Sequence, residues 1–310
     1  MNKINIALLS GGDSPEREVS LNSGKQVFAA LDKTKYNVIN YDPAFDLDKL
    51  IKVAADIDFA LIIMHGELGE DGSVQGLLDL LKIPYQGSGI LGSALAMNKI
   101  VSKRLYEHDS ILVPPYILLN SSQKSSSEQC IEKFGLPLII KPVSCGSSVG
   151  ISVVKNKEDF DKGLKSAFNF DNEIIIEKYI DGVELTCGVI GNTKLETFPI
   201  IQIIPDKKYA FFDYEAKYVP GATNEICPAP IDENIAMQTA ELAKKAHRIL
   251  NCRGYSRTDM ILKDNLLFVL ETNTIPGMTP TSLLPISAKA AGIEFGELLD
   301  KLIELGRETR

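Results

Sequence analysis

Two strand-like runs, YSRTDMIL and LLFVLETN, lie close together near the end of the chain and carry polar residues at alternate positions. Arg257 and Asp259 alternate on the first run, and Glu271 and Asn273 alternate on the second. Since side chains on a strand point alternately to the two faces of a sheet, each pair shares one face. The sequence therefore predicts a hairpin in which each strand presents a matched polar pair.

The turn between the runs decides whether both pairs lie on the same face. Directly opposed residues must then have positions that sum to an even number, which requires an odd-length loop or a bulge. The polar segment Lys263 to Asn265 satisfies this condition as a three-residue loop. Two carboxylates and an amide carbonyl are hard oxygen donors, too few to complete a magnesium shell without water or phosphate oxygens. The hairpin is thus a candidate magnesium and nucleotide site, and the alternative is an ordinary solvated strand face.

The composition limits the classes of protein to which this chain can belong. With 310 residues, 45% of them hydrophobic, it can bury a large core and divide into two or three domains. The formal charge of -8 argues against a general nucleic-acid-binding protein, so a polyanionic ligand needs locally placed lysines and arginines. Five cysteines without a CxxC motif argue against a disulfide framework or zinc site, and a reducing cytoplasm is the simplest setting. Apolar runs such as FALIIM are too short to span a bilayer, so we expect neither an export signal nor a membrane anchor.

The first part of the chain alternates between strand and helix patterns. The runs INIALLS and FALIIM read as strands, while a segment from about Arg17 to Leu31 and the run SVQGLLDLLK read as helices. This order predicts a βαβ unit with a parallel sheet. Ser14 is placed to cap the first helix, Pro15 suits its first position, and Glu16 would lie at its positive end.

The rest of the chain is richer in strands. The runs LPLIIKP, GISVV, EIIIEKYI and TFPIIQII predict strands, whereas NSSQKSSSEQ and the polar segment from Pro205 to Ala222 predict loops. A helix is expected from about Glu233 to Leu250, and another ends the chain. Apolar side chains at helical spacing make one face of that last helix a core face: Phe295, Leu298, Leu299, Leu302 and Ile303.

A glycine- and serine-rich segment, KPVSCGSSVG from Lys141 to Gly150, separates two of the predicted strands. Small residues let backbone N–H groups approach phosphate oxygens, hydroxyls add donors, and a lysine adds a point charge. It is not a Walker A loop, because the lysine precedes the glycines and no helix pattern follows. The segment predicts a flap over phosphates, and the alternative is a simple turn.

The run EIIIEKYI ends in polar residues that could meet a nucleotide base. Backbone groups at Tyr179 and Ile180 could pair with the base, and Glu184 could accept hydrogen bonds from ribose hydroxyls. The alternative reading is an edge strand whose charges prevent edge-to-edge association.

Taken together, the motifs resemble the ATP-grasp superfamily and, within it, the D-alanine–D-alanine ligases. The resemblance covers essentially the whole chain, and the ligases are distinguished from other ATP-grasp proteins by EREVS, HGELGEDG and YEAKY. The matching segments are SGGDSPEREVSLNSG, MHGELGEDGSVQGLLDLLKIPYQGSG, MNK, IIKPVSCGSSVGISVV, IEKYIDGVELT, FFDYEAKY, YSRTDMIL and LETNTIPGMTPTSL.

The resemblance implies an α/β (α+β) chain with the ATP-grasp fold and three domains. These are an N-terminal parallel-sheet α/β substrate domain at 1–97, a central domain with the flap at 98–185, and a C-terminal domain with the metal site and a loop that closes over the substrates at 186–310. It also implies a cytoplasmic homodimer formed through the first domain. ATP and two magnesium ions, with manganese as a possible substitute, are the implied cofactors.

The resemblance further assigns roles to individual residues. The metal ligands would be Asp259, Glu271 and Asn273. The nucleotide contacts would be Lys99, Lys141, Ser147, Ser148, Glu177, Lys178, Tyr179, Ile180, Glu184 and Lys217, of which Lys217 reaches the transferred phosphate. A hydrogen-bonded triad would join the loop, the flap and the first domain: Tyr218, Ser147 and Glu16. The first D-alanine would be held by Glu16 with His65 nearby, the carboxylate of the second by Ser282, and the oxyanion by Arg257 and the N–H of Gly277.

These residue types fit the implied chemistry, which makes D-alanyl-D-alanine for peptidoglycan precursor synthesis. The γ-phosphoryl of ATP first moves to the carboxylate of one D-alanine, and the amine of a second then displaces phosphate from the acylphosphate. Tyr218 favours the dipeptide, because relatives that make the lactate-ended product carry histidine there. Ser144 and Cys145 depart from the basic and acidic residues common in the flap of relatives.

Two alternatives to this activity are open from the sequence. The chain could be another ATP-grasp carboxylate–amine ligase with a different acid and amine, or a nucleotide-binding regulatory protein that has lost catalysis. Glu16, His65 and Tyr218 argue against the first alternative, and intact Arg257 and Lys217 argue against the second.

Overall fold

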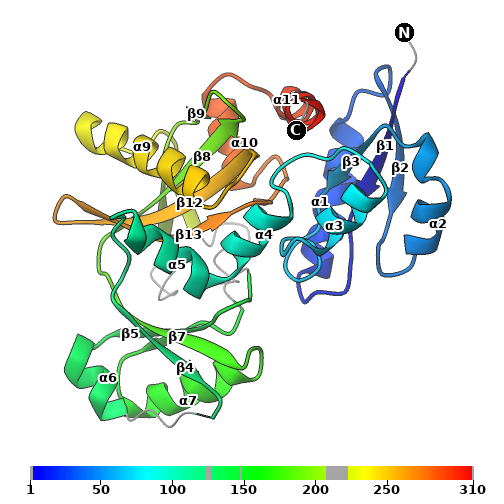
Figure 1. Cartoon of the computed structure of the whole chain (residues 1–310). Helices are drawn as coiled ribbons and strands as arrows, with labels where there is room; N and C mark the ends of the chain where they lie inside the picture. The colour runs from blue at the N-terminus through cyan, green and yellow to red at the C-terminus, as the bar shows by residue number, and fades with distance from the viewer. Residues whose placement is uncertain (1–2, 123–126, 147–148, 207–222, 309–310) are drawn as a thin grey trace.

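The structure is a computed structural model of the chain, and it describes residues 3–122, 127–146, 149–206 and 223–308. Three sheets organise the molecule, and Figure 1 shows the N-terminal sheet in blue, the central sheet in green, and the C-terminal sheet with strands from green (β8) to orange (β12 and β13). In the described segments, no helix combines the length and apolar character that crossing a membrane requires. All five cysteines lie in these segments as free thiols, as their spacing predicts.

The N-terminal sheet is parallel, which confirms the βαβ prediction. Its strand order is β2-β1-β3, so β1 lies in the middle and is almost wholly buried. The strands are β1 (Ile4–Leu9), β2 (Tyr36–Tyr41) and β3 (Phe59–Ile62). The helical elements are α1 (Arg17–Ala30), α2 (Leu47–Lys52), η1 (Ala54–Asp56), α3 (Ser73–Leu80) and α4 (Ile90–Met97).

The N-terminus of α1 differs from the expected cap. The Ser14 hydroxyl accepts a hydrogen bond from the Glu16 N–H at 3.2 Å, in the turn that precedes the helix, and it donates to the backbone oxygen of His65 at 2.7 Å. Glu16 occupies the N-cap position, and no side chain caps the helix there. The helix end therefore ties the chain near Ser14 to the end of β3, and it places Glu16 at the positive end of α1 as expected.

The central sheet is antiparallel, with the order β4-β7-β5-β6. Both of its helices pack on one face, below the sheet in Figure 1. The strands are β4 (Tyr116–Asn120), β5 (Leu138–Pro142), β6 (Ser152–Val154) and β7 (Glu173–Lys178), and the helices are α6 (Ser127–Phe134) and α7 (Lys157–Phe168). Part of the serine-rich segment predicted as a loop belongs to α6, because Cys130 and its apolar neighbours on that helix are buried against the sheet.

The C-terminal sheet has the order β11-β10-β8-β12-β13, with β9 paired to β8. Its strands are β8 (Val183–Gly191), β9 (Glu196–Thr197), β10 (Ile201–Pro205), β11 (Thr223–Ile226), β12 (Gly254–Lys263) and β13 (Leu266–Asn273). Its helices are α5 (Lys99–His108), α9 (Glu233–Ile249), α10 (Leu283–Ala290) and α11 (Phe295–Arg307). Because β8 begins at Val183, we propose the limit between the second and third parts just before this strand instead of at 185.

The terminal helix α11 joins the C-terminal and N-terminal parts through one core. Leu298, Leu299, Leu302 and Ile303 are at most 1% exposed and pack with residues of β1 and β3, as the helical spacing predicts. Phe295 is partly buried against the same core. The N-terminal sheet is therefore held against the C-terminal sheet.

The hairpin of β12 and β13 closes through a two-residue turn, so the expected three-residue loop is wrong. Lys263 pairs with Leu266, and Asp264 and Asn265 form the turn with φ values of 50° and 60°. Two residues with positive φ are what a type I′ turn requires, and Asp and Asn adopt that conformation more readily than most residues.

A bulge then supplies the even-sum register that the loop does not. The register shifts between Asp259 and Met260, so Asp259 lies opposite Glu271 and Arg257 lies opposite Asn273. Opposed residues of an antiparallel pair share a face of the sheet. Both polar pairs therefore lie on one face, as the sequence predicts.

Candidate active site

A pocket of about 400 Å³ lies between the central and C-terminal sheets. We call it the inter-sheet pocket. Its walls come from β5 and β7 on one side and from β8, β10, β12 and β13 on the other. Most of the predicted nucleotide contacts and two predicted metal ligands line it: Lys141, Glu177, Lys178, Tyr179, Ile180, Glu184, Asp259 and Glu271.

Lys141 and Glu177 form part of the pocket wall on the central sheet, and Lys103 of α5 lies behind Glu177 to make a row of three buried charges. The two oxygens of Glu177 lie 2.9 Å from the ammonium of Lys103 and 2.8 Å from that of Lys141. Burial alone would raise the pKa of Glu177, but the two lysines hold this pKa below its usual range. The carboxylate is therefore ionised, and it fixes the ammonium group of Lys141 at the pocket wall.

On the opposite wall, Asp259 is the centre of a hydrogen-bonded group. Arg257 donates to it from Nε at 2.9 Å and from a terminal nitrogen at 2.7 Å. The Thr186 hydroxyl donates at 2.5 Å, and the amide nitrogen of Asn273 donates at 3.2 Å. This two-point pairing fixes the plane of the Arg257 guanidinium group relative to the carboxylate.

Lys99 connects the flap to β13. Its ammonium donates to the backbone oxygen of Cys145 at 2.5 Å and lies 3.8 Å from Glu271. The Asn98 side chain caps α5 by accepting hydrogen bonds from the N–H groups of Ile100 and Val101. This cap fixes the position of Lys99, the first residue of the helix. Lys99 therefore lies beside the predicted metal ligands, although it does not line the inter-sheet pocket.

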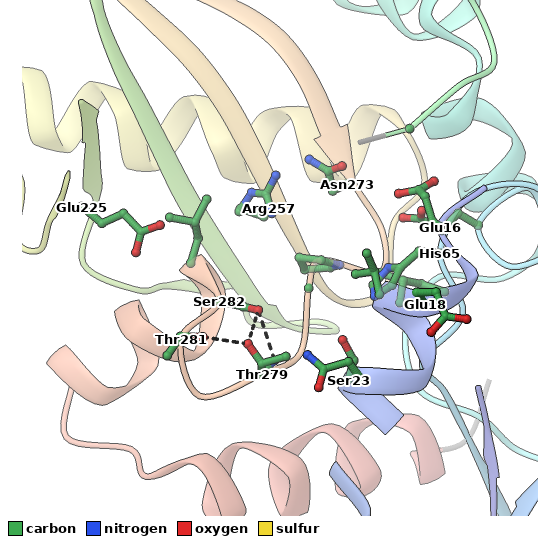
Figure 2. Close-up of a pocket in the computed structure, with 18 residues that line it drawn as sticks. Glu16, Glu18, Ser23, His65, Glu225, Arg257, Asn273, Thr279, Thr281 and Ser282 are labelled. Atoms are coloured by element: carbon green, nitrogen blue, oxygen red, sulfur yellow. Dashed lines mark hydrogen bonds between the residues drawn. The ribbon is translucent and has the colours of Figure 1, made fainter. Parts of the chain in front are cut away.

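A second pocket, of about 370 Å³, borders the other polar pair of the hairpin, Arg257 and Asn273. We call it the Arg257 pocket. Figure 2 shows Glu16 and His65 on one side of it, and Ser282 and Thr279 on the loop next to Arg257. Asn273 and Gly277 also line it.

The carboxylate of Glu16 lies between two glycines. A Cβ atom added at Gly66 would be 2.5 Å from Oε2 of Glu16, and one added at Gly146 would be 2.9 Å from the same atom. Gly66 also has a φ of +74°, which disfavours other residues. Glu16 is only 5% exposed, so its charge is directed into the Arg257 pocket at the edge of the flap.

His65 is 6% exposed, and burial lowers its pKa to about 4. It is therefore neutral at physiological pH and can donate or accept a hydrogen bond without adding charge. Ser282 precedes α10, and its hydroxyl accepts from the Thr279 N–H at 3.1 Å. This loop therefore presents hydroxyl groups and a helix N-terminus to the pocket.

Three acidic or basic residues near the pockets were not found from the sequence. Glu70 and Glu225 line the Arg257 pocket, and burial, together with the nearby Glu16 carboxylate, raises the pKa of Glu70 above its usual range. Lys103 pairs with Glu177 from α5. Glu70 lies in the HGELGEDG motif and Lys103 lies one helical turn after Lys99, and these were the available signals.

Four predicted site residues lie outside the described residues: Ser147, Ser148, Lys217 and Tyr218. Within the described ranges, no group of three or more His, Cys, Asp or Glu side chains could hold a metal ion. The predicted ligand set has only two carboxylates and an amide, so it would depend on ligand oxygens from outside the protein.

Comparison with known proteins gives consistent results. The family model "D-ala D-ala ligase C-terminus" matches residues 105–304, and "D-ala D-ala ligase N-terminus" matches residues 42–88. A D-alanine–D-alanine ligase of Syntrophobacter fumaroxidans is 54% identical over 99% of this chain and 98% of its own length. One of Desulfotalea psychrophila is 51% identical over 99% of this chain and 96% of its own length.

Solved structures show the same similarity. The D-alanine–D-alanine ligase of Bacillus anthracis complexed with ATP has a TM-score of 0.85 and 37% identity, covering 98% of this chain and 97% of that one. The VanG D-Ala:D-Ser ligase of Enterococcus faecalis has a TM-score of 0.85 and 31% identity, covering 98% of this chain and 100% of that one.

The two sheets that enclose the inter-sheet pocket, together with these neighbours, define an ATP-grasp ligase that uses ATP and a divalent metal ion. The second pocket brings Arg257 of the hairpin together with the buried carboxylate of Glu16. On identity and coverage, the chain belongs to the D-alanine–D-alanine ligase family.

Proposed function

We propose that the protein ligates two molecules of D-alanine to D-alanyl-D-alanine, with ATP converted to ADP and phosphate through an acylphosphate intermediate. The product would serve peptidoglycan precursor synthesis and so cell-wall formation and cell shape. Membership of the family supports the activity. We further propose a cytoplasmic homodimer as the working form.

One observation carries this proposal on structural grounds. The two pockets meet at the β12–β13 hairpin, where Asp259 and Glu271 line the inter-sheet pocket and Arg257 and Asn273 line the Arg257 pocket. A phosphoryl group that leaves a nucleotide in the first pocket would therefore arrive next to the arginine in the second. This is the arrangement that transfer to a bound carboxylate requires.

In the inter-sheet pocket, we assign the nucleotide to the residues predicted from the sequence. Lys141 and Lys99 are placed to meet phosphate oxygens, and the ion pair with Glu177 supports this role because it fixes the Lys141 ammonium. Lys178, Tyr179, Ile180 and Glu184 line the same pocket and would contact the base and ribose. Ser147, Ser148 and Lys217 complete the proposed set from outside the described residues.

The donor chemistry of the hairpin fits a magnesium site. Asp259 and Glu271 supply carboxylate oxygens, and Asn273 can supply its carbonyl oxygen because its amide nitrogen is directed to Asp259. Two bound magnesium ions, or manganese in their place, would neutralise the charge on the phosphates during transfer. Because Asp259 also pairs with Arg257, the hairpin links the nucleotide side of the site to the amino-acid side.

In the Arg257 pocket, Glu16 would hold the ammonium group of the first D-alanine, with His65 beside it. The neutral state of His65 supports these roles, because Glu16 then carries the charge that attracts the ammonium. Arg257 and the N–H of Gly277 would stabilise the oxyanion that forms when the second amine attacks. Ser282 would hold the carboxylate of the second D-alanine, and Tyr218 with Ser147 would join Glu16 in closing the site.

The test measures phosphate release with ATP, magnesium and D-alanine, and identifies the product by mass. L-alanine, D-serine and D-lactate run in parallel, because a neighbouring structure is a D-Ala:D-Ser ligase. Release of phosphate with the mass of D-alanyl-D-alanine supports the proposal. If ATP binds but D-alanine yields neither phosphate nor dipeptide, the proposal fails, and a screen of other acids and amines then separates a ligase of different specificity from a nucleotide-binding protein without catalysis.

A further inference from the structure

We propose that Lys103 is a positioning residue for the nucleotide: it holds Glu177 from behind, and Glu177 in turn holds Lys141 in the inter-sheet pocket. The inference rests on the proposed nucleotide site and deepens it. Lys141 and Glu177 line that pocket, whereas Lys103 is 0% exposed on α5.

The geometry places three charges in a row, with the carboxylate in the middle. One oxygen of Glu177 lies 2.9 Å from Lys103, and the other lies 2.8 Å from Lys141. The Glu177 side chain is 3% exposed, so water cannot replace either lysine as its partner. Each oxygen therefore has one ammonium group, and Lys141 shares the carboxylate with a second cation.

The helix α5 is built to contribute this charge. Lys99 and Lys103 are one turn apart, so both project from the same side of the helix, toward β13 and β7 respectively. Further along, the Tyr106 hydroxyl donates to Thr272 of β13 at 2.7 Å. In Figure 1, α5 lies between the central and C-terminal sheets, so one helix contacts both walls of the pocket.

Burying the ammonium group of a lysine costs desolvation free energy, so the charge of Lys103 has to be explained by an interaction. Burial lowers the pKa of Lys103, although the nearby Glu177 raises it. Without Lys103, the whole negative charge of Glu177 would act on Lys141 and draw its ammonium group away from the phosphates. Alternatively, Glu177 would take up a proton and release Lys141 altogether. Either outcome weakens nucleotide binding and leaves the Arg257 pocket unchanged.

The first experiment compares Lys103→Met with the matched control Arg104→Met, which removes a positive charge from an exposed position on the same helix. We expect Lys103→Met to raise the KM for ATP and weaken ADP binding by calorimetry roughly 10- to 100-fold, the loss that is typical when a residue that orients a binding group is removed. The KM for D-alanine and the kcat at saturating ATP should change less than about threefold, within ordinary variation for a remote substitution. Equal losses in all these parameters, or none, would overturn the proposal.

A double-mutant cycle tests whether Lys103 acts through Glu177. In a Glu177→Gln background, Lys103→Met should change the ATP KM by less than about twofold, because the group on which it acts is gone. A further tenfold rise would show an independent effect and would refute the positioning role. This comparison also serves if the single variant does not fold, and Lys103→Arg, which keeps the charge, should restore ATP binding.

The calorimetric measurement separates this inference from the proposed function. ADP binding needs no D-alanine, so weaker binding by Lys103→Met supports the positioning role even if the dipeptide never forms. Dipeptide formation with unchanged ADP affinity in the variant would leave the ligase assignment intact and remove the role of Lys103.

Discussion

Gly146 leaves no room for a methyl group beside the carboxylate of Glu16. A Cβ atom at this position would lie 2.9 Å from Oε2 and 3.4 Å from Oε1 of Glu16. Gly66 borders the same carboxylate, so the carboxylate has little space into which it can retreat. Gly146→Ala should therefore displace the Glu16 carboxylate, because the end of a side chain moves more easily than a backbone.

The size of the effect follows from the proposed role of Glu16. A hydrogen bond between a buried carboxylate and an ammonium group contributes about 1.5–3 kcal/mol. Loss of this bond corresponds to a decrease of roughly 10- to 150-fold in kcat/KM for the first D-alanine. ADP binding should change little, since Glu16 lines the Arg257 pocket and not the inter-sheet pocket. Glu16→Gln should lower the same parameter.

The assay is steady-state kinetics with D-alanine varied at saturating ATP, combined with calorimetry of ADP. Gly76→Ala is the matched control, because a Cβ atom there would meet only Ile90 at 3.7 Å. As a helical position, Gly76 should accept alanine with a gain in stability of about 0.5–1 kcal/mol. If Gly146→Ala leaves kcat/KM for D-alanine unchanged, or weakens ADP binding instead, the proposed place of Glu16 is refuted.

Three further predictions follow from the hairpin, from the helix beside it and from a buried histidine. Asp259→Asn should lower kcat at least roughly 100-fold at any magnesium concentration, whereas Asp264→Asn, in the turn at positive φ, should be neutral; equal activity of the two variants would contradict the metal-ligand role. Tyr106→Phe should lower the free energy of unfolding in urea by about 1–2 kcal/mol because Thr272 loses its donor, and an unchanged urea midpoint would refute this contribution. Burial lowers the pKa of His247 to about 4 from an ordinary value of 6.5, so the folded protein binds fewer protons than the unfolded chain between these values. The stability that depends on a neutral His247 is complete above pH 6.5 and is lost as the pH falls toward 4. His247→Asn should therefore reduce the fall of Tm between pH 6.5 and 4. Parallel curves of Tm against pH for the two proteins would count against this prediction.

The polar pairs of the hairpin could be predicted because strand alternation and register parity depend only on spacing. The turn could not, since either an odd loop or a bulge satisfies the parity, and this chain uses a bulge between Asp259 and Met260. The strand β2 was missed because only its end residues, Tyr36 and Tyr41, are buried, which leaves no alternating pattern.

The charged residues behind the site were harder to predict than those that line it. Residues such as Lys141 and Glu16 lie in motifs that the family resemblance assigns. Lys103 lies outside those motifs, and its spacing of one helical turn from Lys99 does not reveal its burial, because a lysine on a helix is ordinarily exposed and only the packing of α5 against β7 buries it. Likewise, Ser14 accepts from the N–H two residues on, as its spacing predicts, but its second bond, to the carbonyl of His65 in the loop after β3, depends on tertiary packing.

Transfer of oxygen from D-alanine to phosphate tests the acylphosphate route most directly. With D-alanine carrying ¹⁸O in its carboxylate, the first carboxylate bonds to the γ-phosphorus, and the bridging oxygen leaves with phosphate when the second amine attacks the carbonyl carbon. The account predicts one ¹⁸O atom in each phosphate released, while the other ¹⁸O of the same carboxylate stays as the oxygen of the new peptide carbonyl. Unlabelled phosphate formed together with the dipeptide would contradict it.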